Sequence, residues 1–189
     1  SNTKYLVELR NGEVKSLFAK DLELAEIGRI LYAKPYVDSK VEELKERVKK
    51  LNKKPTLVII RANNDEPSER YIRNKIKKCE EVGILSVIIR YDENVTQEEI
   101  KNKIEELNSD DEVCGILLQL PIYEHLDSDY LIDQICPYKD VDCLSSWNLG
   151  KLLKGEENIA SCTPFGAIEL LKFYGIDLKG KDCLVINSS

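Results

Sequence analysis

The stretch Tyr71-Ile72-Arg73-Asn74-Lys75 brings together an aromatic ring and an amine. On a helix, Tyr71 and Lys75 are four positions apart, so their side chains project from the same face. A tyrosine ring can stack on a flat ligand, and partial burial lowers the pKa of a lysine until it can move protons near neutral pH. The alternative is an exposed lysine beside a tyrosine that only packs. The spacing therefore marks a candidate site for ligand stacking and proton transfer.

The neighbouring residues predict the helix that would carry this pair. Asp65 is a suitable N-cap, and Pro67 has the fixed φ that suits a first helical turn. Apolar residues recur behind them at helical spacing, and a glycine then closes the segment: Ile72, Ile76, Cys79 and Gly83. The lysine and the tyrosine should therefore lie beside a stripe that faces a core.

Three apolar segments, 56–60, 84–89 and 114–120, alternate with amphipathic patterns and are typical of buried parallel strands. We therefore predict an α/β fold, a three-layer catalytic domain in which helices cover both faces of a parallel sheet. Right-handed crossovers place the loops that follow such strands at one edge of the sheet, where ligands bind. Tyr71 and Lys75 follow the first strand and Gln119 ends the third, so all three should meet at that edge.

The remaining segments predict four parts of the chain. Residues 1–29 form an N-terminal arm or a hairpin with a turn at Asn11-Gly12. The other three are a catalytic domain over 30–150, a connecting segment with a helix over 151–175, and a strand within 176–189. We expect this strand to be the first of an incomplete Rossmann-like nucleotide-binding domain, and we expect the native polypeptide to continue for about one further domain.

Composition excludes several classes of function. The 189 residues carry a net charge of -6 without a dense basic cluster, which argues against a nucleic-acid partner. No apolar run reaches membrane-spanning length, so no membrane partner is expected. The six cysteines form no C-x-x-C pair, which favours reduced thiols and a cytoplasmic location. The single histidine, His125, cannot complete a zinc site with cysteines at these spacings, so no metal is expected.

Four motifs occur in order: Tyr71-x-x-x-Lys75, a segment from Gly115 to Pro121 that contains Gln119, Lys139-Asp140-Val141-Asp142, and Cys162-Thr163-Pro164-Phe165-Gly166. In this order and at these spacings, the chain from about residue 30 onward resembles the bifunctional methylenetetrahydrofolate dehydrogenase/methenyltetrahydrofolate cyclohydrolase family. The resemblance implies one-carbon folate metabolism: oxidation of 5,10-methylenetetrahydrofolate to the methenyl form and hydrolysis to 10-formyltetrahydrofolate. It also implies tetrahydrofolate derivatives as partners and a homodimer for the full-length protein.

The resemblance assigns roles to individual residues. Tyr71 corresponds to the tyrosine that stacks on the pterin, Lys75 to the catalytic lysine, and Gln119 to the glutamine that hydrogen-bonds this lysine. Asp142 corresponds to the aspartate that binds the amino-pyrimidine edge, whose adjacent N–H donors suit a carboxylate. Asp140 is expected to brace its loop, Thr163 to cap a helix, and His125 to have a structural role. The cysteines are expected in the core.

The chain departs from the family pattern at two places that matter. Cys143 stands where the family has a glycine after the aspartate. Ser188 and Ser189 occupy the last two positions of a Gly-Arg-Ser motif, so that Ser188 replaces the arginine that holds the 2′-phosphate of the cofactor. We therefore expect NAD at least as much as NADP, bound by a domain that follows this chain, with Ser188 and Ser189 as its first contacts. The 189 residues alone should lack dehydrogenase activity.

Two other classes of function share part of this pattern. Short-chain dehydrogenases also use Tyr-x-x-x-Lys, but they need a glycine-rich loop after the first strand. Here that loop reads Arg61-Ala62-Asn63-Asn64, without glycine. The second alternative is a folate-binding module or a degenerate paralogue without hydride transfer. The presence of the lysine, the glutamine and the aspartate together argues against degeneration.

Overall fold

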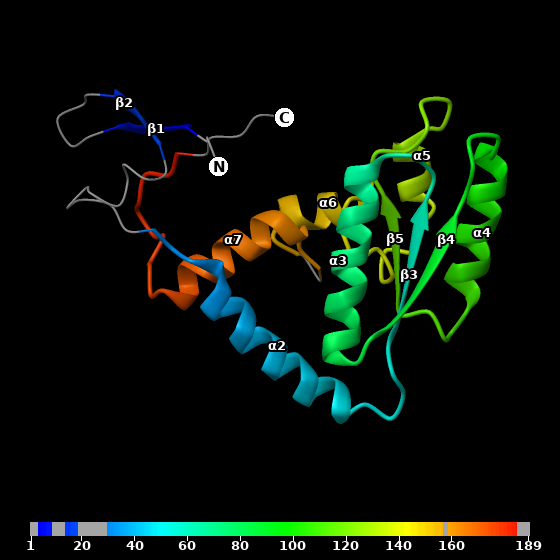
Figure 1. The fold of residues 1–189 in the computed structure, drawn as a ribbon, viewed down its shortest axis with the longest axis horizontal. Helices are drawn as coiled ribbons and strands as arrows, with labels where there is room; N and C mark the ends of the chain where they lie inside the picture. Colours follow the sequence, from blue (N-terminus) through cyan, green and yellow to red (C-terminus); the bar gives the residue numbers. More distant parts are fainter. Residues whose placement is uncertain (1–3, 9–13, 19–29, 157–158, 185–189) are drawn as a thin grey trace. The chain divides into compact units, whose positions relative to one another are not determined.

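The computed structural model of the protein describes residues 4–8, 14–18, 30–156 and 159–184 (Figure 1). The elements follow the chain in this order: β1 (Lys4–Glu8), β2 (Val14–Phe18), α2 (Ala33–Lys49), β3 (Thr56–Arg61), α3 (Glu66–Val82), β4 (Leu85–Arg90), α4 (Gln97–Ser109), β5 (Gly115–Gln119), α5 (Ser128–Asp133), α6 (Ser146–Lys154) and α7 (Cys162–Phe173). They divide into two compact units, the described residues of 37–167 and those of 1–36 with 168–189.

The larger unit is organised around a three-stranded sheet in the order β4-β3-β5, with both pairs of strands parallel. Helix α3 connects β3 to β4, and α4 lies between β4 and β5, as parallel strands require. The last residue of β3, Arg61, is paired with Arg90 of β4 and Gln119 of β5. The three strands therefore end at one level, and the predicted α/β fold with a common functional edge is confirmed.

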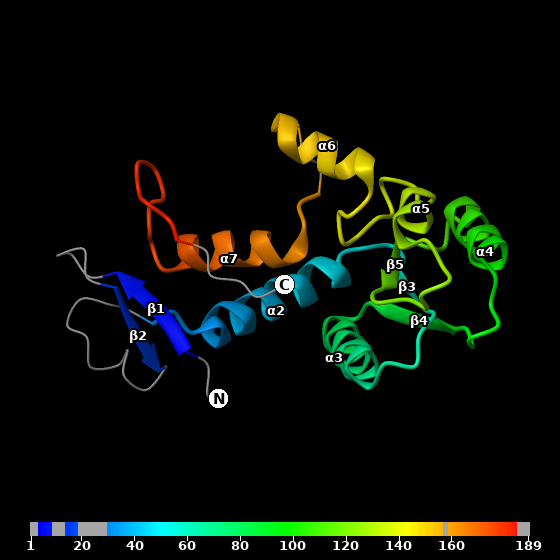
Figure 2. The ribbon, with the colours of Figure 1, turned by 90° about the horizontal axis from the view of Figure 1, so that it is seen from above.

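Helices cover the two faces of this sheet. On one face, Ile72 of α3 packs against Ile59 and Leu117. On the other face, α4 and α5 contribute to a larger cluster with the alternate strand residues, among them Ile60 and Leu118. Figure 2 shows the same arrangement, with α3 on one side of the strands and α4 and α5 on the other. The alternation of side chains along each strand produces these two cores.

Strand β4 differs from the expectation of a strand buried throughout. Leu85 is 49% exposed and Val87 is 48% exposed, whereas every residue of β5 is buried. The reason is topological, because β4 lies at an edge of the sheet while β3 lies between two partners. An apolar run in the sequence looks the same in a central strand and in an edge strand.

Helix α3 begins and ends as the sequence predicts. The Asp65 side chain accepts a hydrogen bond from the amide of Ser68, and Pro67 lies in the first turn. Gly83 closes the helix in the left-handed conformation at φ 89°, which a glycine adopts without steric cost. These caps fix the start of the helix that carries Tyr71 and Lys75.

The expectation that Thr163 caps the last helix is wrong by two residues. Helix α7 begins at Cys162, and the amide of Phe165 donates to the carbonyl of Ser161 at 3.0 Å. Ser161 therefore supplies the first carbonyl of the helix. Pro164 is tolerated in the first turn because its missing N–H would have no partner there.

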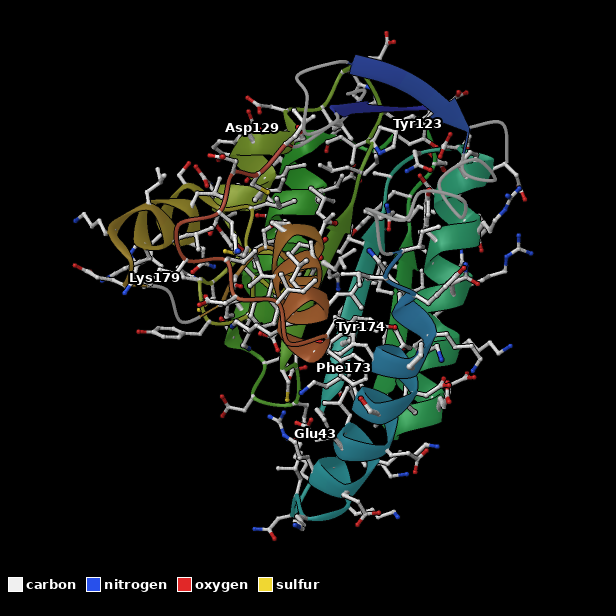
Figure 3. The ribbon with its side chains drawn as sticks, turned by 90° about the vertical axis from the view of Figure 1, so that its left-hand side faces the viewer. Glu43, Tyr123, Asp129, Phe173, Tyr174 and Lys179 are labelled. Atoms are coloured by element: carbon white, nitrogen blue, oxygen red, sulfur yellow. The ribbon has the colours of Figure 1, made fainter. Side chains whose placement is uncertain are left out.

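The smaller unit contains the N-terminal hairpin and the end of α7. Strands β1 and β2 pair antiparallel, with Lys4 opposite Phe18, which confirms a hairpin, while its turn at Asn11-Gly12 lies outside the described residues. The rings of Phe173 and Tyr174 meet edge to face at 5.3 Å (Figure 3). Residues 181–184 form neither helix nor strand, and the rest of the strand expected over 183–186 lies outside the described residues. The domain boundaries derived from the sequence stay predictions.

Candidate active site

Lys75 and Gln119 come from different elements and meet at the carboxyl ends of the strands. Nζ of Lys75, on α3, donates to Oε1 of Gln119, the last residue of β5, at 3.2 Å. Lys75 is partly buried, and Gln119 is 9% exposed. The sheet fixes the glutamine backbone and the helix caps fix the start of α3, so the contact joins two rigid elements.

The carboxamide of Gln119 is held at both ends. Its Nε2 donates to the carbonyl oxygen of Leu120 at 2.7 Å, and its Oε1 accepts from Lys75. Because the NH₂ group is bound to a carbonyl, the oxygen is the atom presented to the amine. The other positions on the amine nitrogen stay available to a ligand.

Cys162 lies near both Lys75 and Asp142, since the charge of each acts on its thiol. The thiol of Cys162 donates to the carbonyl oxygen of Val141, the residue before Asp142, at 3.5 Å. Desolvation at the sulfur and the Asp142 carboxylate raise the pKa of the Cys162 thiol, while the charge of Lys75 lowers it. Lys75, Asp142 and Cys162 are therefore close enough to interact electrostatically.

Cys162 is the residue of this cluster that sequence reasoning missed. Cys162 is exposed, as are Cys114 and Cys183, so the expectation that the cysteines lie in the core is wrong for these three, although the Cys162 sulfur is partly desolvated. The signal was present in the sequence, because Cys162 opens the fourth motif, but a cysteine before a helix has no specific meaning without its neighbours.

Tyr71 lies one helical turn before Lys75 and is 61% exposed. Its ring is therefore open to stacking from solvent. Within the described residues, Lys75 contacts Gln119 and the Cys162 thiol is close enough to Lys75 and Asp142 to be affected by their charges, while no contact joins the Tyr71 ring to Gln119 or Asp142. Ser188 and Ser189, the expected cofactor contacts, lie outside the described residues.

The residues expected to have structural roles have them. Asp140 is 2% exposed, and its carboxylate accepts from the Ser145 amide at 3.0 Å and from Nδ2 of Asn148 at 2.9 Å. Nε2 of His125 lies 2.8 Å from the Val95 carbonyl. Asp140 therefore braces the loop that presents Asp142, as expected, and His125 ties its own loop to the residue that precedes the N-cap of α4.

The hollows of the surface do not by themselves identify this site. A hollow of about 380 Å³ lies between the C-terminal ends of α2 and α3, lined by residues that include Lys45, Val48 and Glu80. Neither Lys75 nor Gln119 lines it, and its lining mixes lysines and glutamates. The candidate site is therefore identified from the contact between Lys75 and Gln119 at the strand ends and not from a hollow.

Comparison with known proteins identifies the family to which the chain belongs. Residues 31–142 match the model of the tetrahydrofolate dehydrogenase/cyclohydrolase catalytic domain. The chain is 47% identical over 137 residues to the bifunctional protein FolD of Mycoplasma mycoides subsp. mycoides, covering 72% of this chain and 48% of the relative. It is 46% identical over 151 residues to that of Acetivibrio thermocellus, covering 78% and 53%. The chain thus spans about half the length of the curated relatives it matches.

Comparison with solved structures identifies the same family. The bifunctional FolD enzyme of Campylobacter jejuni superimposes with a TM-score of 0.81 at 39% identity, over 85% of this chain and 58% of that one. The Trypanosoma brucei enzyme, whose structure contains an NADP cofactor and an inhibitor, gives 0.75 at 29% identity, over 82% and 54%. The match extends across the elements that carry Lys75, Gln119 and Asp142. The chain therefore belongs to the tetrahydrofolate dehydrogenase/cyclohydrolase family and contains its catalytic domain.

Proposed function

We propose that this chain binds a reduced folate and hydrolyses 5,10-methenyltetrahydrofolate to 10-formyltetrahydrofolate, with Lys75 as the acid/base residue. The observation that carries the proposal is the 3.2 Å contact between Lys75 Nζ and Gln119 Oε1. The relatives that the chain matches are named bifunctional FolD proteins, which supports the same reaction.

The chemistry needs one water molecule and two proton movements. Water adds to the electrophilic methenyl carbon and loses a proton, and the bond from that carbon to N5 then breaks as N5 gains a proton. A lysine amine at hydrogen-bond distance can take the first proton and return it. Gln119 orients the amine through its oxygen, so the amine is directed before the substrate arrives.

Asp142 and Tyr71 have binding roles in this proposal. A carboxylate can accept two parallel N–H bonds from the amino-pyrimidine edge of a pterin, and the exposed Tyr71 ring can stack on the pterin face. Asp140 and its three partners hold the loop so that the neighbouring Asp142 is presented in one position.

Titration calorimetry with a tetrahydrofolate analogue tests the binding roles. Asp142→Ala should weaken binding by about tenfold or more, because a hydrogen bond to a charged group contributes about 1.5–3 kcal/mol. Asp129→Ala is the matched control, since Asp129 is an exposed carboxylate on α5 that is not among the proposed site residues. Equal affinity in the Asp142 and Asp129 variants would remove Asp142 from the site.

Hydride transfer is the second half of the family's chemistry, and we propose that it requires sequence beyond the described residues. The loops that follow β3, β4 and β5 contain no glycine, so none of them offers a cradle for a pyrophosphate. These three loops therefore do not fit the pyrophosphate of a nicotinamide cofactor. A folate-binding chain with hydrolase activity but no dehydrogenase activity is the function these residues support best.

The remaining expectations from the resemblance are part of the same proposal. They are oxidation of methylenetetrahydrofolate by the full-length protein, NAD or NADP as its cofactor with Ser188 and Ser189 as contacts, a homodimer, and a place in cytoplasmic one-carbon metabolism. Among the described helices, none has both the length and the apolarity to cross a membrane.

A further inference from the structure

Two loops at the functional edge are joined by hydrogen bonds that the proposed reaction does not itself require. They are the turn 62–65, between β3 and α3, and the segment 120–123, after β5. The amide of Tyr123 donates to the Ala62 carbonyl at 2.8 Å, and Nδ2 of Asn63 donates to the Pro121 carbonyl at 2.5 Å. The Tyr123 hydroxyl adds a contact to Oδ1 of Asn64 at 3.1 Å. The turn 62–65 leads into the helix of Lys75, and the segment 120–123 follows directly after Gln119.

Asn63 is the buried centre of this connection. Its side chain is 6% exposed, and both of its ends are used. Oδ1 accepts from Nε of Arg61 at 3.1 Å and from the amide of Asp65 at 3.0 Å, while Nδ2 reaches the other loop. An isolated turn would be stabilised by the Oδ1 contacts alone. The donation to Pro121 has a different consequence, because it fixes the position of the neighbouring loop.

The Pro121 carbonyl lies one peptide unit from the carbonyl that orients Gln119. The Leu120 oxygen accepts from Nε2 of Gln119 at 2.7 Å and lies 3.5 Å from Oγ of Ser68, at the start of α3. If the Leu120 carbonyl turned away, the glutamine NH₂ would lose its acceptor and could rotate toward Lys75. Two groups that both donate, the NH₂ and the ammonium, would then face each other.

We propose that Asn63 is a positioning residue for the Lys75–Gln119 pair. By holding the Pro121 carbonyl, Asn63 keeps the Leu120 carbonyl directed at Gln119 Nε2, so that Gln119 presents its oxygen to the amine. Asn63 acts through the loop and does not touch the substrate. The consequence for catalysis rests on the proposed hydrolase function, whereas the consequence for the orientation of Gln119 does not.

Asn63→Asp isolates the donation to Pro121. The aspartate keeps an oxygen for Arg61 and for the Asp65 amide but loses the N–H donor and places a carboxylate oxygen against the Pro121 carbonyl. Asn64→Asp is the matched control, because it makes the same change at the adjacent, exposed residue, and its oxygen still accepts from the Tyr123 hydroxyl. Asn63→Ala removes the donor without adding charge beside Arg61.

The first readout is the side-chain amide signal of Gln119 in ¹H–¹⁵N spectra of the chain, assigned with Gln119→Glu. Asn63→Asp and Asn63→Ala should both move this signal, and Asn64→Asp should leave it in place. This measurement needs no enzymatic activity. An unmoved Gln119 signal in either folded Asn63 variant would overturn the proposal.

The second readout is hydrolysis of methenyltetrahydrofolate as a function of pH. Misplacement of a catalytic group by about 1 Å costs up to about a hundredfold in rate, so kcat should fall by about tenfold to a hundredfold in both Asn63 variants, with a smaller change in KM. The pH profile of both Asn63 variants should differ from that of the parent, because Lys75 would face an NH₂ group in place of an oxygen. A profile identical to that of Asn64→Asp would contradict the proposal. Failure of the parent chain to hydrolyse the substrate would instead contradict the proposed function.

Discussion

At the scale of single residues, the site depends on one amine held by one amide oxygen. Lys75 is partly buried, and its contact to Gln119 comes from a strand whose residues are all buried. A lysine has four rotatable bonds, so such a contact restricts its motion before substrate binds. The other lysines of α3 are exposed. The contact with Gln119 therefore distinguishes Lys75 from them.

Lys75→Met should abolish most of the hydrolysis and keep folate binding. Methionine preserves the length of the side chain and removes the amine, and the loss of a general acid/base typically costs about two to four orders of magnitude in rate. Lys77→Met, an exposed lysine two residues along α3, is the control and should keep the parental rate. Parental turnover in Lys75→Met would exclude the acid/base role.

Cys143 is the second informative residue. It has a φ of 55°, is fully buried, and its Sγ lies 3.2 Å from the Ile159 carbonyl. The left-handed conformation is unfavourable for any residue with a Cβ. The thiol contact offsets this strain, which explains how a cysteine is accommodated directly after Asp142.

A matched pair of variants separates the two effects at this position. Cys143→Ala loses the thiol contact and keeps the strain, whereas Cys143→Gly loses the contact and relieves it. The glycine variant should therefore be the more stable of the two by about 1–2 kcal/mol in urea unfolding. A more stable alanine variant would show that the backbone at residue 143 is not strained.

At the scale of elements, the ends of β3, β4 and α3 are joined through Glu69. Its two carboxylate oxygens accept from Nη1 of Arg61 at 2.8 Å and from Nη2 of Arg90 at 2.9 Å. The hydrogen bond from Arg90, followed by the charges of Arg90 and Arg61, lowers the pKa of Glu69 from the ordinary 4.5. Glu69 therefore holds the helix of Lys75 to the strand ends.

This arrangement predicts a pH-dependent part of the stability. A carboxylate whose pKa is lowered by folding stabilises the protein above its unfolded-state pKa, and this contribution is lost as pH falls through the folded value. Glu69→Gln should therefore lower the melting temperature at pH 7, and the difference from the parent should shrink as pH falls below 4.5. Melting curves at pH 7 and at acidic pH measure this. A difference that stays constant with pH would rule out the ionic contribution.

At the scale of the whole molecule, the residues proposed to bind folate all lie in the larger compact unit. Hydride transfer requires a nicotinamide ring held against the reacting carbon, because proximity supplies much of the rate enhancement. The chain spans about half of its curated relatives. Lys75 and Gln119 both lie within one compact unit of the described residues, so the proposed hydrolysis needs no group from the other unit.

The isolated 189-residue chain should therefore hydrolyse the methenyl substrate while it fails to reduce NAD or NADP in the presence of methylenetetrahydrofolate. Absorbance at the wavelength of the reduced cofactor measures the second reaction, and loss of methenyl absorbance measures the first. The FolD enzyme of Campylobacter jejuni provides the positive control. Cofactor reduction by the isolated chain at a rate comparable to this control would contradict the proposal.

The sequence by itself determined the α/β fold, the caps of α3, and the convergence of Lys75 with Gln119. These follow from local rules, because apolar runs, helical spacing and capping residues are encoded in neighbouring positions, and parallel strands place their following loops at one edge. The family motifs then named Asp142 without any geometry.

Only the tertiary structure decided which residues support this site. The exposure of β4 depends on its place at the edge of the sheet. The effect of Asp142 on Cys162 and the hydrogen bond from Asn63 to Pro121 each involve two positions that are 20 or more residues apart. No local pattern records such pairs, since an asparagine in a turn or a cysteine before a helix has many uses. Their roles depend on which strands become neighbours, and that is fixed by how the sheet and its helices bury their apolar faces together.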